Sequence, residues 1–232
     1  RASDADALQA STNAMQAAGG NAEDVVKAAG EEASKLASSK QAGEKAPHQL
    51  VNDVTDAVAV EAAKQGVPAK KAAQLAAAVV KDAGADDAHA KKAVALATAK
   101  MALAEGKSAE QALAEAAKAV KAAGASGKDV AEHVSEVATS LPETKDKPVE
   151  QVAKLAADAV KAAGGNDKEA AQAASVAAAQ AAKQSRASDA DALQASTNAM
   201  QAAGGNAEDV VKAAGEEASK LASSKQAGEK AP

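Results

Sequence analysis

Apolar residues recur along this chain at the spacing of one face of a helix. The strict alternation expected of a half-buried strand is missing, and the intervening positions hold mostly alanine, lysine, glutamate and glutamine, which are strong helix formers. One packing stripe, with members at i, i+4, i+7 and i+11, consists of Val130, Val134, Val137 and Leu141. The pattern therefore predicts an all-α fold.

Glycines and small polar residues divide the apolar pattern into segments. Glycine accepts the left-handed turn that follows a helix, and the next small polar residue can cap the following helix. The predicted helix-terminating glycines are Gly19, Gly84, Gly124, Gly164 and Gly204. Predicted capping pairs are Asn21 with Asp24, Ser108 with Gln111, and Asn166 with Glu169. Helices are expected near residues 4–18, 22–40, 48–65, 68–83, 86–105, 108–123, 127–141, 148–163 and 167–184.

Two repeat lengths are superimposed on this pattern. The glycines Gly84, Gly124, Gly164 and Gly204 recur at a constant step. This step indicates a helical hairpin of about 40 residues as the underlying unit. We expect these hairpins to stack as an alanine-rich α-solenoid or an extended up-down bundle, each stabilised by its neighbours.

The longer repeat is an identity. Residues 1–47 return letter for letter as residues 186–232. Divergence of two domains would have left differences, so the identity indicates recent duplication or homogenised repeats in a longer array. Residues 1–185 then form one complete repeat of about nine helices, and residues 186–232 begin the next.

Composition limits both the core and the partners. Alanine makes up about a third of the chain, there are no aromatic residues, cysteines or isoleucines, and leucine and valine together number 31 of 232. Because a buried alanine removes little apolar area from water, stability must come from many weak contacts. A net charge of −5 favours no nucleic-acid partner, and no uncharged apolar run is long enough to predict a transmembrane segment.

Candidate chemistry is sparse, and we expect no enzyme, cofactor or metal site. The three histidines, His48, His89 and His133, are spread over different predicted hairpins, whereas a metal or proton-transfer site would need two of them to converge with a carboxylate. A solvated surface position explains His89 and His133 best. The paired glycines lack the lysine, the spacing and the preceding strand of a phosphate-binding loop.

The two arginines stand at equivalent positions of the long repeat. Arg1 and Arg186 are the only arginines in the chain. One interpretation is a processing junction that releases single repeat units from a polyprotein. The alternative is an exposed linker residue that recurs with the repeat, and N-terminal sequencing of native material separates the two.

The sequence favours a structural role. The limited set of residue types resembles the composition of alanine-rich antifreeze helices, helical desiccation-protecting proteins and insect coiled-coil silks. The 11-residue and heptad patterns of those families are absent. We expect part of a tandem-repeat array that acts as a fibre, sheath, spacer or stalk outside the cell or at its surface, and that associates with copies of itself. The alternative is an ice-binding or stress-protective helical protein, which thermal hysteresis would reveal.

Overall fold

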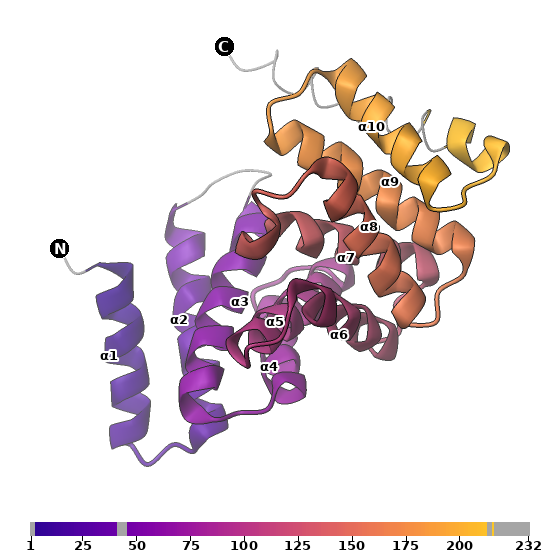
Figure 1. Cartoon of the computed structure of the whole chain (residues 1–232). Coiled ribbons are helices and arrows are strands. Elements are labelled where there is room, and N and C mark those ends of the chain that lie inside the picture. The colour runs from indigo at the N-terminus through magenta and orange to yellow at the C-terminus, as the bar shows by residue number, and fades with distance from the viewer. Residues whose placement is uncertain (1–2, 41–45, 213–214, 216–232) are drawn as a thin grey trace, which may run out of the picture. The chain divides into compact units, whose positions relative to one another are not determined.

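The chain folds into α-helices arranged as consecutive hairpins. The structure, a computed structural model, describes residues 3–40, 46–212 and 215, and within these ranges it contains helices and no strand (Figure 1). The predicted all-α fold is therefore confirmed. The chain divides into two compact units, Arg1–Ala125 and Ser126–Pro232, which are described in turn.

The described part of the first unit holds six α-helices. They are α1 (Asp4–Ala17), α2 (Ala22–Lys40), α3 (Ala46–Gln65), α4 (Ala69–Asp82), α5 (Asp87–Ala104) and α6 (Ala109–Ala122). Each helix packs against the next one along the chain, and α2 also packs against α4, as α3 does against α5. Contacts to the next and the next-but-one helix are what stacked helical hairpins produce.

The second unit repeats this arrangement. It contains α7 (Gly127–Ser140), the short 3-10 helix η1 (Pro142–Thr144), α8 (Val149–Ala162), α9 (Asp167–Gln184) and α10 (Asp189–Ala202), and residues 207–212 are also helical. Helix α9 packs against α7, α8 and α10. Because these neighbours cover it on several sides, α9 is buried nearly all round. Its buried residues are nine alanines and Ser175.

The predicted hairpin period is visible in the helix bounds. Four helices of equal length, α4, α6, α8 and α10, begin at a constant step, at Ala69, Ala109, Val149 and Asp189. The alternate helices α5, α7 and α9 begin with the same step, at Asp87, Gly127 and Asp167. The helical hairpin is therefore the structural unit of the fold.

The predicted capping pairs are confirmed. In the pair at the start of α6, the Gln111 N–H donates to Ser108 Oγ at 3.2 Å, and the Ser108 N–H donates to Gln111 Oε1 at 3.0 Å. The same reciprocal bonds join Asn21 with Asp24 and Asn166 with Glu169. These bonds satisfy backbone donors that the first turn of a helix leaves without an intrahelical partner.

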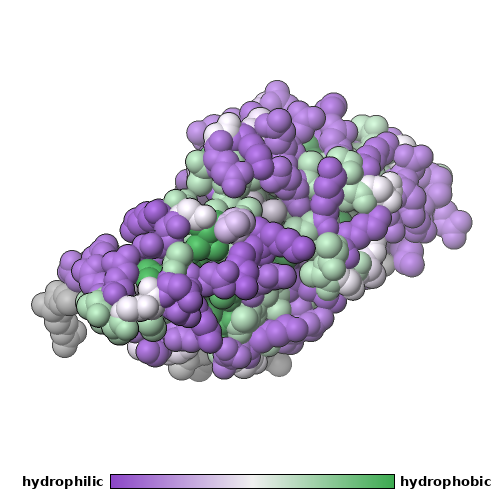
Figure 2. Space-filling view, turned by 90° about the horizontal axis from the view of Figure 1, so that it is seen from below, coloured by the Kyte–Doolittle hydropathy of each residue, from purple (hydrophilic) through white to green (hydrophobic). Residues whose placement is uncertain are grey.

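The core is made of small side chains. Its largest fully buried members are leucines and valines, among them Leu96, Leu113 and Leu141, and most other core residues are alanine. Figure 2 shows one face on which hydrophilic residues predominate and hydrophobic residues form small patches. Two valines are exposed among the described residues, Val60 with 56% of its surface exposed and Val211 with 72%.

Candidate functional site

The predicted helix-terminating glycines adopt the backbone conformation that glycine favours. Their φ angles are 82° for Gly19, 87° for Gly84, 82° for Gly124, 76° for Gly164 and 92° for Gly204. At Gly124 a Cβ atom would meet nothing within 4 Å, so the left-handed backbone rather than lack of space selects glycine there.

Arg186 occupies the same kind of turn. Its φ of 62° makes it the single non-glycine residue with a positive φ in the described part of the chain. Its N–H donates to the Lys183 carbonyl at 2.9 Å, and the Ala187 N–H donates to the Ala182 carbonyl at 3.0 Å, which closes the end of α9. Arg186 is exposed. The position fits a linker residue between α9 and α10, and cleavage there stays a prediction; Arg1 lies outside the described residues.

The valine stripe of α7 is enclosed. The exposed fractions are 3% for Val130, 0% for Val134, 0% for Val137 and 1% for Leu141. Helix α7 packs against both α8 and α9. Because two neighbours cover it, more than the stripe is buried on this helix.

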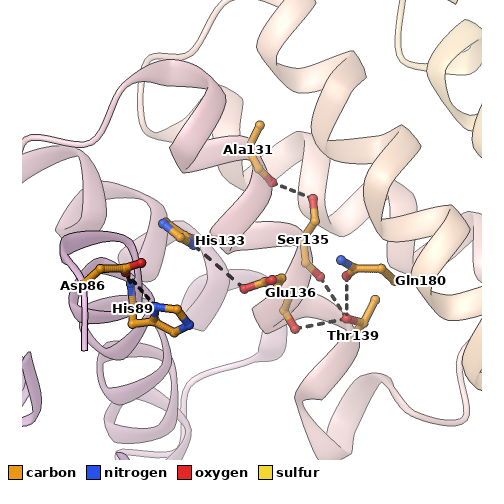
Figure 3. Close-up of polar contacts among 8 residues, drawn as sticks. All are labelled: Asp86, His89, Ala131, His133, Ser135, Glu136, Thr139 and Gln180. Carbon is orange, nitrogen blue, oxygen red and sulfur yellow. Dashed lines mark hydrogen bonds and ion pairs between the residues drawn. The ribbon is translucent and has the colours of Figure 1, made fainter. Parts of the chain in front are cut away.

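The surface interpretation is wrong for one histidine. His133 keeps only 8% of its surface exposed, and its Nδ1 lies 3.9 Å from Glu136 Oε2 (Figure 3). Glu136 lies off the apolar stripe, where the periodicity predicts exposure to water, and it is half-buried. Both residues flank the stripe, so burial on α7 extends beyond its most apolar side. The side chain of His48 lies outside the described residues.

Buried hydroxyl groups cross-link α7 and α9. Ser135 Oγ lies 2.6 Å from the Ala131 carbonyl oxygen of its own helix and 2.8 Å from the Ala173 carbonyl oxygen of α9. One turn further on, Thr139 Oγ1 lies 3.1 Å from Gln180 Oε1 of α9 (Figure 3). Sequence reasoning missed these bonds. One signal was available, because Ser135 and Ser175 stand at equivalent places in two successive hairpins.

The start of the second copy of the repeat packs against α9. Ser175 Oγ of α9 and Ser196 Oγ of α10 form a buried hydrogen bond of 2.7 Å. Beside it, Met200 packs in an apolar cluster with Ala171 of α9 and with Val210. We call this contact between α9 and residues 186–212 the repeat joint.

A glycine permits the close packing of the repeat joint. A Cβ atom at Gly205 would lie 2.6 Å from Met200 Cγ and 3.4 Å from Ala171 Cβ. The first distance is shorter than carbon atoms tolerate, so an added side chain would force Met200 or the adjacent backbone to shift.

An ion pair borders the repeat joint. Lys168 Nζ of α9 donates to Asp209 Oδ1 at 2.5 Å. The hydrogen bond to Asp209 raises the pKa of Lys168 above its ordinary value. Because 67% of the lysine side chain is exposed, the pair orients the joint more than it stabilises it.

An apolar groove runs between α8 and α10 over α9. Its volume is about 420 Å³, and its floor is formed by alanines of the three helices, Ala153, Ala157, Ala174, Ala178, Ala195 and Ala199. Charged side chains border it, including Lys154 and Asp158, whose Nζ and Oδ2 atoms lie 2.5 Å apart. Such a groove follows from stacking alternate helices with small side chains. A similar groove lies between α1 and α3 over α2.

A polar pair caps the start of α5. His89 donates its backbone N–H to Asp86 Oδ1, and its ring Nδ1 lies 2.6 Å from the same oxygen. These hydrogen bonds hold the pKa of Asp86 below its ordinary value, and the backbone bond has the larger effect. Within residues 3–40 and 46–212, no cluster of three or more histidine or carboxylate side chains could hold a metal ion. None of the described helices combines the length and apolarity needed to cross a membrane.

Comparisons with known proteins found no family model, no curated protein and no solved structure that matches the chain.

Proposed function

We propose that the chain is a segment of a structural tandem-repeat array, in which successive copies of the long repeat stack through the repeat joint. The array would act as a fibre, sheath, spacer or stalk, outside the cell or at its surface. The observation that supports this proposal is the repeat joint itself: the sequence that restarts the repeat packs onto α9 through a buried hydroxyl pair and an apolar cluster.

The packing also supports an array, because the stability of this fold is distributed over many helix contacts. Each contact buries small side chains, so no single helix gains much on its own, while the sum grows with the number of neighbours. Consecutive and next-but-one helices share these contacts in both units. A chain built in this way can be lengthened by adding copies without a new core.

The test is to lengthen the chain by whole copies. Proteins that carry one, two and three additional copies of the long repeat should show a maximum dimension in small-angle X-ray scattering that increases by the same increment for each copy. A dimension that grows only with the cube root of mass would mean that the copies collapse into one globule and would refute the array. Thermal hysteresis at micromolar concentration would replace this proposal with the ice-binding alternative.

A further inference from the structure

Two helices of identical sequence differ in what covers them. In α10, which packs on α9 and α8, the exposed fractions are 0% for Ala192, 1% for Ser196 and 3% for Met200. The equivalent residues of α1, Ala7, Ser11 and Met15, are all only partly buried. Since the sequences are the same, the difference comes from neighbours: α1 packs chiefly against α2, on the side of Thr12.

The partly exposed face of α1 has the same local form as the covered face of α10. A Cβ atom at Gly20 would lie 2.8 Å from Met15 Cγ, just as one at Gly205 would lie 2.6 Å from Met200 Cγ. The opposite faces also agree, because Gln9 donates to Asn13 at 2.8 Å and Gln194 donates to Asn198 at 2.7 Å. The α1 face is therefore already in the shape that α9 recognises in the repeat joint.

We infer that the α1 face, formed by Ala7, Ser11 and Met15, is a binding surface for helix α9 of a second copy of this chain. The register is that of the repeat joint. Ser11 would pair with Ser175 of the other copy, Met15 would pack on its Ala171, and Asp24 would receive its Lys168. Asp24 is exposed, whereas its equivalent Asp209 is partly covered and already holds Lys168. The inference rests on the proposed function, since it uses the same joint between molecules instead of within one.

Within one molecule, α9 is covered by that molecule's own α10. Binding between molecules is therefore an exchange of one identical segment for another, and the internal segment has the higher effective concentration. The unsubstituted 232-residue chain is expected to stay closed and monomeric. Weakening its own α10 uncovers α9 and makes the α1 face of a second molecule the better partner, so molecules associate head to tail.

The Met200→Asp variant tests this exchange in the full chain. It places a carboxylate in the apolar cluster of α10 and leaves α1 unchanged. Sedimentation should shift from monomer to dimer and longer species. The matched control Met15→Asp changes the same residue of the identical helix and should remain monomeric, as should the double variant Met15→Asp, Met200→Asp. A monomeric Met200→Asp protein, or a double variant that associates equally well, would overturn the inference.

Disulfide trapping identifies the register, because the chain contains no cysteine. In the Met200→Asp background, one protein carrying Ser11→Cys is mixed with an isotope-labelled protein carrying Ser175→Cys. A mixed disulfide dimer is expected, because the equivalent Ser175 and Ser196 oxygens lie 2.7 Å apart, close to the separation that a disulfide needs. Asn13→Cys, on the exposed face of α1, replaces Ser11→Cys as the control and should form far less of it.

A third protein separates failure of the inference from failure of the proposed function. Ser175→Cys combined with Ser196→Cys in one otherwise native chain should form an internal disulfide. If this bond does not form, the repeat joint is wrong and the array proposal fails with it. If it forms while Ser11→Cys does not link to Ser175→Cys, only the association between molecules is refuted.

Discussion

Replacing Val26 or Val211 by alanine makes the same chemical change in the same local sequence. The two valines are equivalent residues of the two identical copies. Val26 is fully buried, whereas 72% of Val211 is exposed. Val26 shares a helix face with Gly30, where an added Cβ would lie 2.8 Å from Val58 of α3 and 3.3 Å from Val79 of α4. The pair of variants therefore isolates the contribution of neighbouring helices.

The expected difference follows from the groups removed. Valine to alanine deletes two methyl groups, which at about 0.8 kcal/mol per buried carbon gives roughly 1.6 kcal/mol, and the cavity left behind raises the loss to about 2–3 kcal/mol. Alanine is the better helix former by about 0.5 kcal/mol, and this gain is common to both variants. Val26→Ala should lower the free energy of unfolding by about 2 kcal/mol, while Val211→Ala should leave it unchanged or raise it slightly.

Hydrogen exchange measured by mass spectrometry suits this comparison. It must follow helices of unique sequence, because peptides from the two identical copies cannot be told apart. Peptides from α3 and α4 should lose protection in Val26→Ala, since stability in stacked repeats is local. In Val211→Ala the protection of α8 and α9 should stay at its native level. Equal losses in both variants, or a loss below about 0.5 kcal/mol in Val26→Ala, would refute the claim that neighbours determine the energetics.

Three further variants test other parts of the fold. Val134→Asp buries an unpaired charge in α7 and should cost several kcal/mol; hydrogen exchange should show lost protection in α7 to α9 and native protection in α4. Arg186→Gly relieves a left-handed backbone at a non-glycine residue, and thermal melting should show a gain of about 0.5–1 kcal/mol. A hydrogen bond from Lys81, followed in size of effect by one from Lys91, lowers the pKa of Asp87 from 3.8 to about 2. The stabilisation is therefore present above about pH 4 and is lost as the pH falls toward 2; denaturation at several pH values should show a weaker acid dependence for Asp87→Asn.

Helix ends could be predicted because they depend on local chemistry. A glycine such as Gly124 accepts a left-handed backbone without any help from other helices, and the Ser108 and Gln111 side chains cap α6 from within its own first turn. The helix bounds consequently differ from the expected ones by only a residue or two.

Burial on the flanks of the helices could not be predicted in the same way. Periodicity identifies the most apolar side of α7, but it does not report how many neighbours the helix has. His133 is buried although it stands beside the valine stripe and not in it. The identical helices α1 and α10 show the same limit more directly, since one sequence has two patterns of burial.

The buried Ser175 and Ser196 pair also bears on how a chain of near-identical hairpins finds its correct register. The equivalent positions two hairpins earlier are Ala95 and Ala116, both fully buried. If α10 docked on α5 instead of α9, the Ser196 hydroxyl would face an alanine, and an unpaired buried hydroxyl costs about 1–3 kcal/mol. An all-alanine version would tolerate this slip. The two hydroxyl groups thus favour docking of α10 on α9 over docking on α5 during folding.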